Sequence, residues 1–370
     1  MKSLIKIILS TVLFLLSLNA SGKDIQILKD TTSIRLIRQG IDRIYNFRFP
    51  EAEEVFAKID KRHPGHPVTY LLKAMEIYWE NFPLMPASPA RKSYEESLHK
   101  CIDLSENKQK QTEEPEYLLI NLCARGLLLL FYTDNGLSFE AFPLIGGTYQ
   151  GIRSSFDYTS VYSDFNYFTG IFNYYREVYP VLYPVYKPLT IIIPRGDKLA
   201  GIKQLRIAAG SAIVLRAESL IFLSQIFLNY ENNIQQSLFY CMTLHELYPD
   251  NPSYEEEYIK NLLLSKQYDK AESQLLSHES KLSNSFFRAQ FTILNGILKE
   301  KKYHDYKTAS QLYLTGIKDI SVYGNYDREF SAFAYYGLSR ISESKGDKYN
   351  TKQYRRLGDE NADFKKINFD

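Results

Sequence analysis

One spacing of small and aromatic residues constrains the fold of this chain more than any other feature. Gly40, Ala52, Phe56 and Pro64 follow one another at intervals of 12, 4 and 8 residues. Small side chains at Gly40 and Ala52 allow two antiparallel helices to approach closely, and Phe56 fills the space between successive hairpins. Pro64 ends the second helix because it cannot continue the helical hydrogen bonding. The spacing therefore predicts a helical hairpin.

Apolar residues recur at helical spacing through most of the remaining chain, so we expect further hairpins. The glycine-rich stretch 139–162 has no preceding strand and no phosphate-binding Gly-Lys-Ser/Thr, so it is assigned to helix packing and turns. The predicted helix pairs are 68–79 with 92–104, 211–230 with 234–248, 254–264 with 268–277, 286–299 with 306–320, and 330–344 with 349–363.

Small residues return where the later pairs are expected to cross. Ala271 closes the turn that starts at Lys266, and Gly296 precedes Ala309 by 13 residues. Gly337 precedes the last turn, where the spacing is looser, as expected of a terminal repeat.

These intervals resemble those of the tetratricopeptide repeat, most specifically at 40–64 and less so at 221–271 and 296–313. The resemblance implies an all-α solenoid of antiparallel hairpins, wound as a right-handed superhelix. The order of segments is also similar to envelope tetratricopeptide proteins of Bacteroidetes-like bacteria. That similarity implies an interaction or scaffolding role and supplies no catalytic residue.

The segment 164–209 is the one irregular part of the predicted solenoid. An aromatic helix leads into a proline-rich connector at 181–194, and a helix restarts with Asp197 near its N-terminus. Each proline restricts the residue before it to extended geometry, so the connector cannot be helical throughout. We expect this segment to interrupt or bend the superhelix.

Tyr167, Tyr174 and Tyr175 on the aromatic helix form the candidate binding surface. The chain contains 30 tyrosines, so two interpretations stay open. The rings serve as ordinary helix packing, or they line a groove in which each hydroxyl reaches a ligand or water.

The N-terminal residues have the pattern of a secretory signal peptide. Lys2 and Lys6 precede the apolar run Ile7–Leu18, and a cleavage site is expected near Ala20; an uncleaved signal anchor is the alternative. This predicts export to the periplasm or cell envelope.

The predicted organisation then follows in order. It comprises a signal peptide 1–20, a polar linker 21–30, N-terminal repeats 31–163, the central segment 164–209, C-terminal repeats 210–363 and a frayed tail 364–370. The apolar run 127–132 at the end of the predicted helix 116–132 is expected to be too short to span a bilayer and to belong to a buried solenoid helix, so no transmembrane span is predicted in the mature chain.

Charge and cysteine content exclude some classes of protein. The 45 basic and 43 acidic residues give a net charge of +2 with no basic stripe, which argues against a nucleic-acid partner. Cys101, Cys123 and Cys241 lie within apolar helical patterns and are expected to be buried free thiols, with a single disulfide as the alternative.

No known catalytic or cofactor-binding motif occurs, so a non-catalytic protein without cofactor or metal is expected. His63 and His66 are interpreted as solvent-exposed turn residues, because no acidic third ligand is near in sequence. The acidic run Glu255–Glu257 is attributed to the helix dipole and to solvation.

The sequence therefore predicts a helical-repeat adaptor that binds a partner protein or an extended peptide in the groove made by the first helices of its hairpins. Two alternatives stay open. One is a protein that binds or hydrolyses an envelope polymer in a tyrosine-lined cleft. The other is carriage of a lipid or small molecule, which requires a closed apolar cavity.

Overall fold

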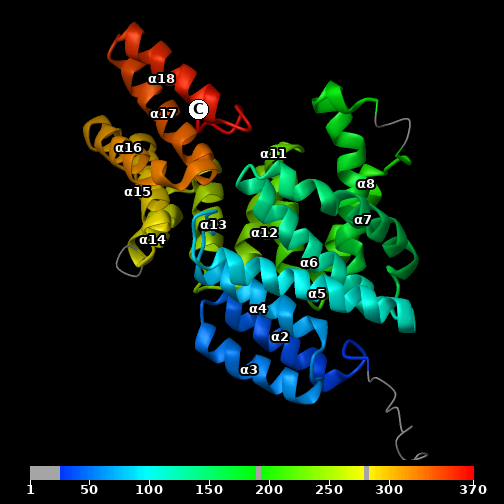
Figure 1. Ribbon diagram of the computed structural model, residues 1–370. Coiled ribbons are helices and arrows are strands. Elements are labelled where there is room, and N and C mark those ends of the chain that lie inside the picture. The colour runs from blue at the N-terminus through cyan, green and yellow to red at the C-terminus, as the bar shows by residue number, and fades with distance from the viewer. Residues whose placement is uncertain (1–25, 189–192, 279–282) are drawn as a thin grey trace, which may run out of the picture.

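The computed structural model describes residues 26–188, 193–278 and 283–370, so the predicted signal peptide lies outside the described residues. The described chain is 78% helical and contains no strand, which confirms the all-α prediction (Figure 1). The helices are α2 (Thr31–Tyr45), α3 (Phe49–Arg62), α4 (Pro67–Glu80), α5 (Arg91–Thr112), α6 (Pro115–Asp134), α7 (Ser138–Ser155), α8 (Phe165–Leu182), α10 (Lys198–Ser211), α11 (Arg216–Asn229), α12 (Ile234–Leu247), α13 (Pro252–Leu264), α14 (Tyr268–His278), α15 (Ser285–Lys301), α16 (Tyr306–Ile320), α17 (Arg328–Ser344) and α18 (Lys348–Asn361).

Helices that follow one another in the chain pack together as hairpins, and the hairpins stack in chain order. The fold is thus a helical-repeat solenoid, as predicted. Figure 1 shows α2 and α3 at one end of the molecule, with α7 and α8 on one side of the central helices and α15 to α18 on the other.

Side-chain caps set the start of many helices. The carboxylate of Asp30 accepts hydrogen bonds from the amides of Thr32 and Ser33, which starts α2. Asp197 accepts from the amide of Ala200 at 2.9 Å and starts α10 at the predicted place. Such caps satisfy amides that have no partner inside the helix, so the local sequence fixes these boundaries.

Small residues allow the hairpins to pack closely. A Cβ added to Gly40 would lie 2.9 Å from the ring of Phe56, so this ring packs inside its own hairpin, against the small residue that the spacing places in α2. The ring of Tyr313 lies against both Gly296 and Gly337, where an added Cβ would meet it at 2.8 and 2.3 Å. One tyrosine therefore fills the space between two successive hairpins.

The other residues predicted to pack the repeats also have clear positions. Ala52, Ala271 and Ala309 are fully buried. Pro64 lies in the exposed turn between α3 and α4, where it follows the last residue of α3 by two positions.

The central segment is a hairpin of α8 and α10. Helix α8 continues through Pro180 to Leu182, and a short 3₁₀ turn follows at Pro184–Tyr186. The two helices approach closely because a Cβ on Gly170 would lie 3.0 Å from the carbonyl oxygen of Gly201. The irregular connector therefore begins later than predicted.

Asp164 joins the central segment to the next hairpin. Its buried carboxylate accepts hydrogen bonds from the amides of Ile213, Val214 and Leu215 at 2.7–3.0 Å. Burial raises the pKa of this carboxyl group, and the three amides oppose that rise. The loop before α11 is thus held against the start of α8.

The solenoid closes on itself through aromatic contacts that the repeat pattern did not predict. The ring of Tyr254 on α13 lies 5.6 Å from Trp79 on α4 and 5.9 Å from Tyr45 on α2, between ring centroids. Nearby, the rings of Phe82 and Phe287 stack at 5.5 Å. These contacts bring the first two hairpins against helices about 200 residues later in the chain.

Helix α6 contains the apolar run 127–132, which the sequence predicts to lie in a buried helix. The helix as a whole, with its 20 residues, is long and apolar enough to cross a membrane. However, 67% of the residues in its apolar window are buried inside the fold. Burial within the protein thus accounts for the hydrophobicity of α6, as in the core helix of a soluble domain.

Both ends of the described chain are better packed than expected. In the predicted polar linker, Ile27 and Leu28 are buried, and the amide of Leu28 donates to Glu116 at 3.0 Å. In the tail predicted to fray, Ile367 and Phe369 are buried against the C-terminal hairpins. Apolar side chains in otherwise polar stretches explain both corrections.

Cys101, Cys123 and Cys241 are free and buried, as predicted. Burial raises the pKa of the Cys101 thiol to about 12. A thiol that is buried and protonated is a poor nucleophile, so these residues act as core packing.

Candidate functional site: a central aromatic cavity

A cavity of about 600 Å³ lies at the centre of the closed solenoid. It is lined by α2, α4, α6, α8, α11 and α13, the first helices of successive hairpins, together with the loops beside them. This size is in the range of known ligand pockets. The lining residues are Tyr45, Leu71, Met75, Tyr78, Trp79, Phe82, Cys123, Gly126, Leu127, Leu129, Leu130, Thr133, Asp134, Tyr167, Phe168, Val214, Leu215, Glu218, Ile221, Phe222, Gln225, Ser253, Tyr254 and Glu257.

Aromatic rings make much of the cavity wall. Trp79, the single tryptophan of the chain, contacts the rings of Tyr45 and Tyr254 edge to face. Across α8 and α11, the rings of Tyr167 and Phe222 meet edge to face at 5.5 Å. The contacts that close the solenoid therefore also build one wall of the cavity.

Helix α6 can face this cavity because it is apolar on nearly all sides. One side packs in the core, while Leu127, Leu129 and Leu130 line the cavity, and Leu130 is 42% exposed. A Cβ added to Gly126 would meet no atom within 4 Å, so free space begins at its backbone. The apolar composition that makes α6 resemble a membrane-spanning helix thus provides an apolar wall of the cavity.

Glu218 is the most unusual polar group in the cavity. It lies on α11, where its Oε1 accepts a hydrogen bond from the hydroxyl of Tyr45. No described residue gives its Oε2 a hydrogen bond. Burial raises the pKa of the Glu218 carboxyl group to about 7, and the nearby carboxylate of Asp164 adds to that rise. Glu218 is thus close to its titration point at neutral pH.

Asp134, the last residue of α6, places a second carboxyl group in the cavity wall. Burial raises the pKa of this group to about 6. A carboxylate at a helix C-terminus also faces the negative end of the helix dipole. The cavity therefore contains two carboxyl groups whose ionised forms are unfavourable in the unliganded protein.

The third cavity carboxylate, Glu257, is paired. It accepts a hydrogen bond from Lys260 Nζ at 2.8 Å, and Glu256 Oε1 lies 3.7 Å from the same nitrogen. Burial acts to lower the pKa of Lys260, but Glu256 and Glu257, with Glu329, outweigh burial and raise it well above its usual value. Lys260 therefore remains charged.

This arrangement corrects the interpretation of the acidic run. Glu255, Glu256 and Glu257 are all buried, with 0%, 5% and 8% of their surface exposed, so solvation does not explain them. The carboxylate of Glu255 lies 2.6 Å from His245 Nδ1. The expectation was wrong because α13 is buried on nearly all sides, where it packs between α12 and the hairpins that follow it.

The three tyrosines of the candidate binding surface do not form one surface. Tyr167 lines the cavity. Tyr174 is fully buried, and its hydroxyl donates to Glu231 at 2.5 Å. The ring of Tyr175 packs against Tyr179 and Tyr230, with centroids 4.7 and 5.6 Å apart. Of the three, Tyr167 is the one that lines the cavity.

The two turn histidines also differ from their interpretation. His66 caps α4 through the amide of Val68, and its Nε2 lies 3.6 Å from Glu116, with only 9% of its side chain exposed. His63 Nε2 is within hydrogen-bond distance of the Ser33 hydroxyl at 2.7 Å. Neither is a freely exposed turn residue. Within the described ranges, no group of three or more His, Cys, Asp or Glu is arranged to hold a metal ion.

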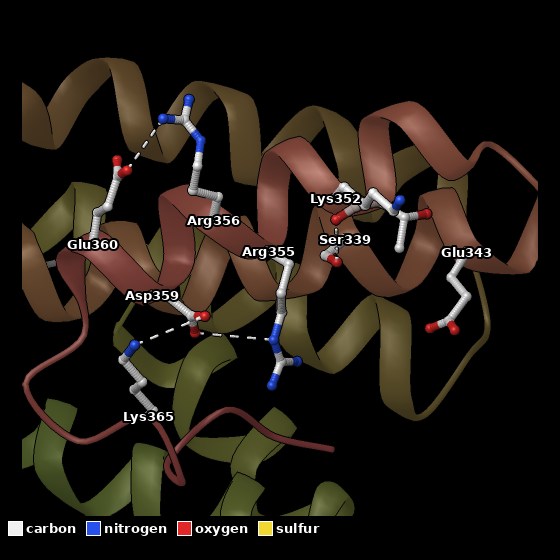
Figure 2. A pocket seen from close by; sticks show the side chains of 9 residues that line it. Ser339, Glu343, Lys352, Arg355, Arg356, Asp359, Glu360 and Lys365 are labelled. Atoms are coloured by element: carbon white, nitrogen blue, oxygen red, sulfur yellow. Dashed lines mark hydrogen bonds and ion pairs between the residues drawn. The ribbon is translucent and has the colours of Figure 1, made fainter.

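A second hollow lies on the C-terminal hairpin of α17 and α18 (Figure 2). Figure 2 shows Asp359 between Arg355 and Lys365, and Arg356 reaching Glu360 at 3.2 Å. Since most of its charged groups pair with one another on an open surface, this hollow is a weaker candidate than the central cavity.

Sequence reasoning missed the central cavity and its carboxylates. Glu218 did give a signal, because a charged residue interrupts the apolar stretch 211–230. Taken alone, such an interruption argues only against a membrane helix. Asp134 gave none, since an acidic residue before a turn is ordinary in sequence.

The chain matches no known protein family, and no curated protein is similar enough to be recognised as a relative.

Proposed function

We propose that this chain is a non-catalytic helical-repeat adaptor, and that the central cavity receives an apolar segment of a partner protein. The observation that carries this proposal is the position of the cavity. Its walls are the first helices of successive hairpins, where stacked repeats form their binding groove. A cavity of about 600 Å³ lined by aromatic and aliphatic residues suits a few apolar side chains.

Site-specific photo-cross-linking tests this proposal. A photoreactive amino acid replaces Leu130, which lines the cavity and is 42% exposed. The matched control places it at Leu199, which is 76% exposed on α10 and does not line the cavity. After irradiation in intact cells of the source organism, the adducts are identified by mass spectrometry.

We expect a reproducible polypeptide adduct at position 130 that is missing at position 199, with an apolar segment at the cross-linked site. Equal capture at both positions, or no polypeptide adduct at position 130, would contradict the adaptor proposal. An adduct with a lipid or other small molecule alone would favour carriage.

We further propose that the hairpins are tetratricopeptide repeats and that the protein acts in the cell envelope. The packing of Gly40 on Phe56 and of Gly296 on Tyr313 supports the repeat assignment. Cell fractionation followed by N-terminal sequencing tests the location. A mature N-terminus near Ser21 in an envelope fraction is expected, and an intact Met1 in the cytosol would contradict it.

One observation favours the alternative of an enzyme acting on an envelope polymer. Glu218 and Asp134, both with raised pKa values, share the cavity with Tyr167. Carboxyl groups with raised pKa values serve as general acids in glycoside hydrolysis. Release of reducing ends from an envelope glycan by the pure protein, lost in Glu218→Gln and kept in Glu343→Gln, would establish this activity in place of the adaptor role.

A further inference from the structure

We propose that the central cavity is selective for a cation, so that the partner segment presents a lysine or arginine side chain beside its apolar residues. The cationic group would lie next to Glu218, among the aromatic rings of the wall. This inference rests on the proposed function, because it specifies the chemistry of the segment that the same cavity receives.

The charge of the wall is the first argument. Among the described residues that line the cavity, three are acidic and none is lysine, arginine or histidine. Lys260 compensates Glu257 from within the fold, at 2.8 Å. Glu218 and Asp134 have no such partner cation in the described ion pairs. The cavity therefore has a negative charge that an incoming cation can balance.

The hydrogen bonding of Glu218 is the second argument. Tyr45 uses one carboxylate oxygen, and Oε2 lacks a hydrogen-bond partner among the described residues. A buried acceptor without a donor is costly, because it has lost its water and gained nothing in exchange. An ammonium or guanidinium group supplies both the donor and the opposite charge.

The rings around Glu218 are the third argument. Tyr45 and Tyr254 both interact electrostatically with its carboxylate, and both contact Trp79. Aromatic faces attract cations through their quadrupole, most strongly where water is excluded. A carboxylate bordered by two tyrosine rings, with a tryptophan ring against both of them, is therefore a suitable site for a basic side chain with an apolar stem.

Other classes of ligand fit less well. An anionic amphiphile such as a fatty acid would bring a third negative charge near Glu218 and Asp134. A neutral apolar ligand would fill the space but leave Glu218 Oε2 without a donor. Of these ligands, a cationic group alone satisfies the shape, the charge and the hydrogen bonding together, and a neutral alcohol satisfies the hydrogen bonding but leaves the charge unbalanced.

Two probes that differ at one end test the selectivity. The fluorescence of Trp79 reports the binding of n-decylamine and of n-decanol at pH 8, where the amine is still protonated. We expect the native protein to bind the amine at least about tenfold more tightly than the alcohol, the order of effect of a desolvated cation–π and carboxylate contact. The ratio should fall towards one in Glu218→Gln and stay unchanged in the exposed control Glu343→Gln.

Equal affinity of the native protein for both probes would overturn the selectivity and leave the proposed function standing. Binding of neither probe would also overturn it, while the cross-linking experiment would still decide the adaptor role. If Glu218→Gln fails to fold, Asp134→Asn supplies a second variant, and the native ratio alone keeps the inference open to refutation.

The cross-linked peptides distinguish the sources of the cation. Segments captured at position 130 should contain lysine or arginine next to apolar residues. Segments without a basic residue would contradict the inference, and capture of a free organic amine alone would contradict its assignment to a partner protein.

Discussion

Two groups of carboxylates, one buried on α13 and one partly buried in the cavity wall, differ in how their charge is balanced. On α13, Glu256 and Glu257 share the ammonium group of Lys260, which is only 3% exposed. In the cavity, Glu218 and Asp134 have raised pKa values, and no lysine, arginine or histidine lines the described wall. The residue types are the same, but only one group has its cation inside the protein.

An internal cation therefore distinguishes a structural charge from one that is available to a ligand. A buried carboxylate with an internal cation has its interaction satisfied on folding, so it holds helices in place. A buried carboxylate without one destabilises the unliganded protein and is stabilised when a cation binds. Such unfavourable groups are often found at functional sites.

The largest effect on stability is expected when Lys260, the cation that balances the α13 carboxylates, is removed. Lys260→Met should lower the free energy of unfolding by about 3 kcal/mol at pH 7, because it leaves Glu256 and Glu257 buried without their cation. Urea unfolding measures the loss. In the control Lys92→Met, an exposed lysine paired with Glu96 is removed, and a loss below about 1 kcal/mol is expected. Equal losses would mean that the α13 group is not balanced by Lys260.

The next largest effect on stability is expected when the charge of Glu218 in the cavity is removed. The pKa of Glu218 is raised from 4.5 to about 7, so the folded protein holds this proton more tightly than the unfolded chain. The free energy of unfolding should therefore fall as pH rises from about 4.5 to 7. Glu218→Gln has no charge to lose and keeps an oxygen for the Tyr45 hydroxyl.

We expect Glu218→Gln to be more stable than the native protein by on the order of 2 kcal/mol at pH 8, and equally stable at pH 4. Because the Glu218 side chain is partly exposed, this gain in stability is smaller than it would be for a fully buried carboxylate. Urea unfolding at several pH values gives the comparison, with Glu343→Gln as control. A destabilised variant at pH 8 would show that the ionised carboxylate is satisfied in the unliganded protein.

Asp134→Asn should have a similar but smaller effect. The pKa of Asp134 is raised from 3.8 to about 6, so the stability cost of its charge should appear between those pH values. A gain of about 1 kcal/mol is expected at pH 8, since asparagine also removes a negative charge from the C-terminal end of α6. Thermal unfolding at pH 4 and pH 8 measures it, and an equal gain at both pH values would exclude the charge as its cause.

The smallest effect concerns the charges in the C-terminal hollow. Arg356→Ala should change the free energy of unfolding by less than about 0.5 kcal/mol, because Arg356 and Glu360 are 68% and 54% exposed. Denaturation in low and high salt measures the change. A loss above 1 kcal/mol would show that the charges of the C-terminal hollow stabilise the fold, as those around Lys260 do.

Much of the fold could be predicted from the sequence because its signals are local. The start of α10 at Asp197 and the contact of Gly40 with Phe56 involve residues within one helix or one hairpin. Capping and helical periodicity act over the same short distances. The order of the hairpins follows from the order of the chain.

The errors concern burial by distant parts of the chain. Tyr174 was a candidate for a binding surface, with helix packing as the alternative, and it is buried with its hydroxyl bonded to Glu231. The acidic run at 255–257 was expected in solvent and is buried. In both cases the helix was predicted correctly, but the helices that cover it could not be identified from its own sequence.

By itself, the sequence determined the helices, their caps and the small residues that bring each hairpin together. Only the tertiary structure decided that the solenoid closes, with Tyr254 against Tyr45 and Trp79, and that a cavity containing Glu218 remains inside. The physical reason is that each hairpin adds a small rotation to the stack, so closure depends on their sum. Helical periodicity determines which face of a helix is apolar, whereas the summed rotation of the hairpins determines which distant residues that face contacts.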